Sequence, residues 1–286
     1  AAQCVNTAGC TNSPLFHEQH TGEHMAASVH AVYFSPTGSS RTIAQEAASV
    51  LAQNLSMTHA EDWDWTFPEG RAAAYTVSAG DVLVFAFPVY AGRVPRLLLE
   101  PLERLAGQGA HVVPLAVYGN RHYDDALLEA VELLYTRQFS ILTAGAFVAE
   151  HSYTSKVGTG RPDAQDMAAL TDFASKAANR IAQGPGGRVQ VPGNRPYKAL
   201  PPAADIRPIT LEGCTGCGLC ASVCPVRVIN EDVPSQTAPG CVRCCACVKI
   251  CPEEARIFDD PLVTKIVGML ETNCQTRREP ETFFAD

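Results

Sequence analysis

The sequence predicts an α/β fold with a doubly wound parallel sheet, followed by a small cysteine-rich module. Apolar runs alternate with helical patterns between residues 29 and 183, and this alternation favours parallel strands joined by crossover helices. Nine of the twelve cysteines lie between Cys214 and Cys251, whereas residues 29–183 contain none. Such clustering favours metal ligation over a disulfide framework, which would staple the whole chain.

The elements of the α/β part are predicted one by one. Uninterrupted apolar runs are typical of strands buried on both faces, and they occur at 29–34, 81–88, 111–119 and 140–150. Helical spacing of apolar residues occurs at 40–53, 96–107, 123–138 and 161–183. Pro101 falls inside the second of these helices, so a kink or a late helix start is expected there. The pattern at 55–80 is ragged, and the second strand is expected within it.

The chain divides into four parts. Residues 1–28 are polar and aperiodic and are interpreted as a loose tail. Residues 29–183 hold five strands and their helices, which is the size of a flavodoxin-like domain with strand order 2-1-3-4-5. Residues 184–208 are rich in Pro and Gly, as in a stiff linker. Residues 209–286 form a small α+β cysteine module that ends with a helix near 261–271.

Charge and hydropathy limit the partners of this protein. A formal net charge of −8 argues against nucleic acid or an anionic membrane, because either partner needs a basic patch. No window approaches 18 consecutive apolar residues, so no membrane span is expected, and the start of the chain lacks the layout of a signal peptide. Thiols kept for metal ligation indicate a reducing compartment, so a cytoplasmic location is expected.

Two runs of the form C-x2-C-x2-C-x3-C-P carry the most specific chemistry. This spacing is the ligand pattern of bacterial ferredoxins, in which three close cysteines bind one [4Fe-4S] cluster and the fourth ligates the other cluster. The rule predicts two clusters with crossed ligands. Cluster A is assigned to Cys214, Cys217, Cys220 and Cys251, and cluster B to Cys241, Cys244, Cys247 and Cys224.

Zinc and disulfides are the alternatives for these thiols. A zinc ribbon uses pairs of C-x2-C, so the third cysteine of each run would be left over. Cys245 interrupts the second run; a plain packing role is expected for it, with a redox or alternate-ligand role as the other interpretation. The tail also contains residues that could bind a stray metal ion, but a disordered polar segment is the favoured interpretation. These residues are Cys4, Cys10, His17, His20 and His24.

A hydroxyl-rich loop, FSPTGSSRT, follows the first predicted strand and opens a helix. Backbone N–H groups at a helix start suit a phosphate dianion, and a glycine lets the backbone pass close to a ligand. The residues singled out in this loop are Ser35, Thr37, Gly38, Ser39 and Ser40. The alternative is an ordinary helix-capping turn.

The loops after the next two strands would then surround a flavin ring, because flavodoxin-like folds bind FMN at the switch point of the sheet. Tyrosines offer faces for stacking, and backbone groups can meet the polar edge of the ring. FMN is therefore predicted as a second cofactor, with tyrosines that only pack at loop ends as the alternative. The loop residues are Pro88, Tyr90, Ala91, Gly92, Tyr118, Gly119, Asn120 and Tyr123. His111, His122 and His151 are interpreted as surface or packing residues.

At this point the chain resembles a known group, the bacterial and archaeal flavodoxin–ferredoxin fusions often called EFR-type ferredoxins. The resemblance spans roughly residues 29–284. It rests on YFSPTGSSRTIA, DWTFP, DVLVFAFPVYAGRVP, YGNRHYDDALLE, AEHSYTSKVGTGRPDAQD, VPGNRPYK, both cysteine runs and RREPETFF. It implies a flavodoxin-like domain joined to a ferredoxin and a role in electron transfer, but it names no reaction. Trp65 departs from the group, in which an aliphatic residue is more usual.

Three functions remain open on the sequence. The first is an electron-transfer flavo-ferredoxin that passes electrons between FMN, two clusters and an external redox partner, either a protein or a small donor or acceptor. The second is a flavin-dependent reductase acting on a small substrate. The third is a ferredoxin whose flavodoxin-like part has lost FMN and serves for docking. Assays of flavin, iron and acid-labile sulfide separate the third from the other two.

Overall fold

The computed structural model describes residues 27–202 and 204–286. The predicted tail, apart from its last two residues, lies outside the described residues, and so does the alternative metal site at its cysteines and histidines. Within the described ranges, none of the helices combines the length and the apolar character needed to cross a membrane.

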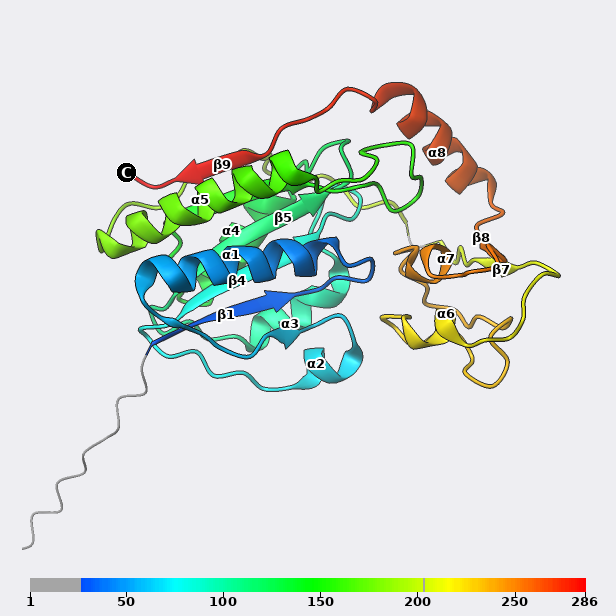
Figure 1. Cartoon of the computed structure of the whole chain (residues 1–286), viewed down its shortest axis with the longest axis horizontal. Helices are drawn as coiled ribbons and strands as arrows, with labels where there is room; N and C mark the ends of the chain where they lie inside the picture. Colours follow the sequence, from blue (N-terminus) through cyan, green and yellow to red (C-terminus); the bar gives the residue numbers. More distant parts are fainter. Residues whose placement is uncertain (1–26, 203) are drawn as a thin grey trace, which may run out of the picture.

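A mostly parallel sheet forms the N-terminal domain (Figure 1). Its strands lie in the order β2-β1-β4-β5-β6-β9. β3 pairs with the same edge of β1 as β2 does, but nearer the carboxyl end of β1. Because β2 and β3 together occupy the place of the second strand, the parallel part has the predicted order 2-1-3-4-5, the flavodoxin-like arrangement. The strands are β1 (Ser28–Tyr33), β2 (Thr58–His59), β3 (Trp63–Asp64), β4 (Val82–Pro88), β5 (His111–Tyr118), β6 (Thr143–Val148) and β9 (Glu281–Phe284).

Helices cover both faces of the sheet, as a doubly wound fold requires. α1 (Ser39–Leu55) and α5 (Ala164–Ala182) pack together on one face, and α4 (Ala126–Thr136) packs against β5 and β6 from the other (Figure 1). The predicted helix at 96–107 is shorter, because a 3-10 turn η1 (Arg96–Leu98) precedes α3 (Leu99–Arg104). Pro101 thus falls in the first turn of α3, where its missing N–H costs no helical hydrogen bond.

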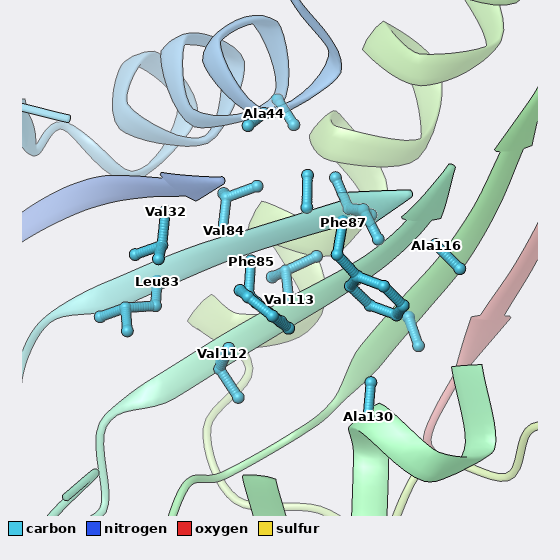
Figure 2. Close-up of a cluster of buried hydrophobic side chains, with 14 of the residues drawn as sticks. Val32, Ala44, Leu83, Val84, Phe85, Phe87, Val112, Val113, Ala116 and Ala130 are labelled. Carbon is cyan, nitrogen blue, oxygen red and sulfur yellow. The ribbon is translucent and has the colours of Figure 1, made fainter. Parts of the chain in front are cut away.

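The core lies on both faces of the central strands. Phe85 and Phe87 are two residues apart on β4, so they point to the same face and stack with ring centroids 5.2 Å apart (Figure 2). Val84 points to the opposite face, toward Ala44 of α1 (Figure 2). Because both faces of β4 are buried, the strand has no polar position before its end, where the next loop emerges.

Besides the five predicted strand positions, one of which β2 and β3 share, the sheet in the described residues has a further edge strand, β9. β9 pairs antiparallel with β6, so Thr143 lies opposite Phe284 at the sheet edge. Residues 281–284 were predicted to belong to the cysteine module, and the pairing places them in the sheet of the first domain instead. The physical reason is that an uncovered edge strand leaves its backbone groups unpaired, and the returning chain end pairs with them.

The predicted linker has no secondary structure, but part of it is docked on the first domain. Asp125 is fully buried and accepts hydrogen bonds from the backbone N–H groups of Asn194 (2.8 Å) and Lys198. These bonds outweigh the effect of burial and hold the pKa of Asp125 below its ordinary value. Residues 189–198 are therefore a fixed strap rather than a free tether.

The cysteine module lies beyond the end of the sheet toward which β1 points (Figure 1). It contains a two-stranded antiparallel sheet of β7 and β8 and two one-turn helices, one in each cysteine run. α8 then leads the chain back to β9, so the module is joined to the first domain at both of its ends. The elements of the module are β7 (Ile209–Thr210), α6 (Leu219–Ser222), α7 (Ala246–Lys249), β8 (Arg256–Ile257) and α8 (Pro261–Asn273). The remaining helix of the first domain is α2 (Pro68–Ala72).

Candidate cofactor site

Two adjoining cavities lie at the carboxyl ends of the parallel strands, where this fold places its ligands. The smaller has a volume of about 80 Å³ and the larger of about 420 Å³, and Thr37 lines both. The smaller cavity gathers predicted flavin residues from three loops, namely Thr37, Ser39, Ser40, Pro88, Tyr90, Tyr118 and Gly119. The larger one is lined by Ser35, Thr37 and Gly38, which complete the predicted phosphate loop.

The start of α1 is suited to an anion. Its first turn contains no Asp or Glu, and its N-cap residue, Gly38, has no side chain. Of the first-turn N–H groups, that of Arg41 donates to Ser35 Oγ (2.9 Å). The long helix α5 differs, because Asp163 caps it and Asp166 completes a capping box. With no carboxylate in its first turn, this 17-residue helix keeps the positive end of its dipole for a ligand. Gly38 has φ +93°, and a side chain there would be strained. The loop therefore fits the phosphate of FMN.

Four predicted flavin residues lie in the loops without lining either cavity described above: Ala91, Gly92, Asn120 and Tyr123. Asn120 is buried, and its Nδ2 donates to the carbonyls of Cys274 and Thr276. Tyr123 is also buried and donates to Glu281. The returning C-terminal segment satisfies these two side chains, so they anchor that segment. The sequence could not show this because the partners are more than 150 residues away.

Glu150, His151 and Ser152, which follow β6, line the smaller cavity, and none of them was predicted to do so. Nδ1 of His151 accepts from the backbone N–H of Tyr153 (3.1 Å). Burial, with help from nearby Lys249 and Arg121, lowers the pKa of His151 to about 4. The ring is therefore neutral at pH 7, with its proton on Nε2, and it offers one donor. The available signal was position alone, since His151 follows a predicted strand at the ligand-binding edge.

The cysteines line two further cavities. Cys214, Cys217, Cys220 and Cys251 line one, and Cys224, Cys241, Cys244 and Cys247, together with Cys245, line the other. The fourth cysteine of each run thus lies with the first three of the other run. Among the described residues, no three His, Cys, Asp or Glu side chains converge tightly enough to hold a single metal ion. Thiols spread around a cavity suit a multi-iron cluster, whose irons are each bound by a separate cysteine.

The two cysteine sets differ in exposure. Cys217 of the first run is exposed, whereas Cys244, Cys245 and Cys247 of the second run are buried. Burial raises the pKa of Cys244 to about 12 and that of Cys247 to about 11 in the unligated protein. These thiols must lose their protons to bind a cluster, so the iron has to stabilise the buried thiolates in place of water.

The second run also forms the boundary with the flavin loops. Cys244 is part of the wall of the smaller cavity, beside Tyr90. Burial, and then the charges that Cys244 and Cys245 would carry, raise the pKa of the Tyr90 phenol, which therefore stays protonated at neutral pH. Tyr153, which follows β6, is affected in the same way. The tyrosines and the buried cysteines form one contact layer between the two modules.

Polar contacts fix the modules against each other. The guanidinium of Arg71 donates to the carbonyl of Pro225, directly after the first cysteine run (2.7 Å). Lys249 Nζ lies 2.6 Å from Glu150 Oε1. Thr154 donates to Glu271 of α8 (2.7 Å). These contacts span separations of 99 residues or more, so the positions of the two cavities depend on the tertiary fold.

A match to a known protein family supports the cysteine module. The family of 4Fe-4S binding domains matches residues 208–230, which include the first cysteine run. A flavodoxin from Streptococcus pneumonia TIGR4 is 19% identical and covers 54% of this chain and 99% of its own, with a TM-score of 0.37. Rubredoxin oxygen:oxidoreductase from the anaerobe Desulfovibrio gigas is 13% identical and covers 55% of this chain and 36% of its own, with a TM-score of 0.39. The search of curated proteins found no match. The chain thus combines a flavodoxin-like α/β domain with a C-terminal region that contains a 4Fe-4S binding domain.

Proposed function

We propose that this protein is an electron-transfer iron–sulfur flavoprotein that binds FMN and two [4Fe-4S] clusters. The flavin would lie in the adjoining cavities at the ends of β1, β4 and β5, with its phosphate on the loop that opens α1. The hydroxyl groups of this loop, the helix start without an acidic residue and the Gly38 backbone support the phosphate position.

The crossed ligand sets support two clusters. Cluster A would use Cys214, Cys217, Cys220 and Cys251, and cluster B would use Cys241, Cys244, Cys247 and Cys224. Each of these two sets lines one of the two cysteine-lined cavities, and Cys245 is an additional residue of the second cavity. Arg256 is buried, lines the cavity of cluster A, and would offset part of the negative charge of four thiolates and a cluster.

The observation that carries the proposal is that Cys244 belongs to the wall of the predicted flavin cavity. It follows that cluster B would be the inner cluster, next to the flavin, and cluster A the outer one. When bound, FMN would supply two-electron storage with one-electron release, and each cluster would carry one electron. The exposed Cys217 marks the outer cluster as the point of exchange with a redox partner.

Anaerobic purification followed by cofactor assays tests this function. We expect about eight iron and eight acid-labile sulfide per chain, as two four-iron clusters require, and one FMN. Iron and sulfide without flavin, even after FMN is supplied, would leave a ferredoxin with a docking module. Zinc in place of iron would contradict the proposal as a whole.

Cys244→Ser and Cys217→Ser form a matched pair that tests the inner and outer positions. Removal of the inner cluster is expected to increase FMN fluorescence strongly, because the neighbouring quencher is lost, whereas removal of the outer cluster changes it little. Equal effects of the two variants would contradict the order of the cofactors while leaving their identity intact.

A further inference from the structure

The larger cavity is built by both modules. The first domain supplies the phosphate loop and Arg41, and also Asp64 at the end of β3, with Thr66 and Phe67 after it. The cysteine module supplies Val223, Ala246, Lys249 and Ile250. Arg41 and Lys249 are the two cations of this lining and Asp64 its one carboxylate, so the wall carries a net positive charge.

Lys249 lies where the two cavities meet. Its side chain lines the larger cavity, and its Nζ is 2.6 Å from Oε1 of Glu150, which lines the smaller one. Glu150 also accepts from the backbone N–H of Gly160 (3.2 Å), so this carboxylate is held in place from the first domain. The ion pair is partly exposed, with 32% of the Lys249 side chain and 25% of the Glu150 side chain accessible. The ammonium can therefore keep this contact and donate a further hydrogen bond into the cavity.

We infer that Lys249 is a phosphate-binding residue of the flavin site, contributed by the cysteine module. The inference rests on the proposed function for the identity of the ligand, FMN. Lys249 shares its cavity with Ser35, Thr37 and Gly38, whereas the loops expected around the ring line the other cavity. Lys249 is thus one of two cations in the cavity that the phosphate loop lines, and a cation there attracts a phosphate dianion.

A flavin site with one wall from each module has a thermodynamic consequence. FMN binds only the arrangement in which the cysteine module is docked, so binding stabilises that docking. The cation at position 249 strengthens the binding of the FMN phosphate but does not contribute to the binding of the flavin ring. FMN and riboflavin, which lacks the phosphate, therefore separate this role from a merely structural one.

The experiment measures the affinities of cluster-containing protein, freed of flavin, for FMN and for riboflavin by fluorescence titration. Lys249→Gln is expected to weaken FMN binding by about tenfold or more, the value of one charge-assisted hydrogen bond, and to leave riboflavin binding unchanged. Higher ionic strength should reduce the difference between wild type and variant, because salt screens the attraction.

Two controls sharpen the result. Lys265→Gln removes an exposed cation of α8 and should leave both affinities unchanged. Glu150→Gln breaks the ion pair but keeps the ammonium, so the preference for FMN over riboflavin should not fall. If Glu150→Gln lowers that preference as much as Lys249→Gln does, the ion pair rather than the lysine explains the effect, and the inference is wrong.

The remaining outcomes also decide the matter. A Lys249→Gln protein that binds FMN like wild type, or that loses FMN and riboflavin affinity equally, overturns the phosphate-binding role while the proposed function stands. A wild-type protein that binds neither flavin overturns both.

Discussion

The two cysteine runs have the same spacing but different surroundings. In the first run Cys217 is exposed and Gly218 occupies the left-handed region, with φ +78°. In the second run Cys244 is buried, and Cys245 occupies the matching position with φ +65°. One motif thus occurs once at a solvent-facing edge and once against the flavin loops. Equal spacing along the chain therefore does not give equal surroundings, because docking against the first domain decides what each run contacts.

The largest expected effect concerns the crossing of the ligands. Cys224→Ser combined with Cys244→Ser removes two ligands of the same predicted cluster, so about four irons should remain. Cys224→Ser combined with Cys217→Ser removes one ligand from each cluster, so little iron should remain. Iron and sulfide assays on the anaerobically purified proteins decide this. The reverse result would mean that each run holds its own cluster.

The next effect concerns the exposure of the two clusters. An iron chelator should remove about half of the iron quickly, from the outer cluster, and the rest slowly, because three of the four inner ligands are buried. FMN fluorescence recorded in parallel should rise with the slow phase. Cys217→Ser protein is the control and should show the slow phase alone. A rise of flavin fluorescence in the fast phase would place the exposed cluster beside the flavin.

A smaller effect tests the matching left-handed positions. Gly218→Ala places a Cβ in open space but at positive φ, so it should cost about 1 kcal/mol of stability. Cys245→Gly relieves the same backbone cost but loses a buried thiol, so its net change should be under about 1 kcal/mol. Denaturation of the cluster-loaded proteins measures both. A large loss for Cys245→Gly with intact iron content would assign the Cys245 side chain more than packing.

The smallest effect concerns an exposed contact beside the first run. Arg227 Nη2 lies 3.6 Å from Glu69 Oε1, and both side chains are largely open to solvent, at 39% and 70%. Glu69→Gln should therefore change the free energy of unfolding by no more than about 0.5 kcal/mol. Urea denaturation measures this. A loss several times larger would mean that the ion pair holds the first run against the domain.

Local patterns were enough for most elements of the first domain. The apolar run at 81–88 predicted β4 within one residue, because a strand buried on both faces has no polar interruption. The helical spacing after the phosphate loop predicted α1. The second strand was not resolved, because β2 and β3 have two residues each and carry no period. β9 was missed because its pairing partner, β6, is more than 130 residues away in the sequence.

The candidate site divides in the same way. The loop residues from Ser35 to Ser40 and the tyrosines Tyr90 and Tyr118 were predicted, since they follow strands at the ligand-binding edge. Lys249 and Glu150 were not, because each is an ordinary charged residue until the fold brings the two together. Asn120 was predicted as a flavin residue, and its amide instead holds the C-terminal segment.

By itself, the sequence determined the class of the first domain and the iron–sulfur character of the first cysteine run, because both follow from spacing along the chain. A period of alternating elements specifies a parallel sheet, and the spacing of thiols specifies the ligands that a cubane needs. The tertiary structure alone decided that the second run faces the loops after β4, β5 and β6, that residues 189–198 form a strap, and that β9 pairs with the edge of the sheet. These features depend on contacts between residues far apart in the chain, which no local period encodes.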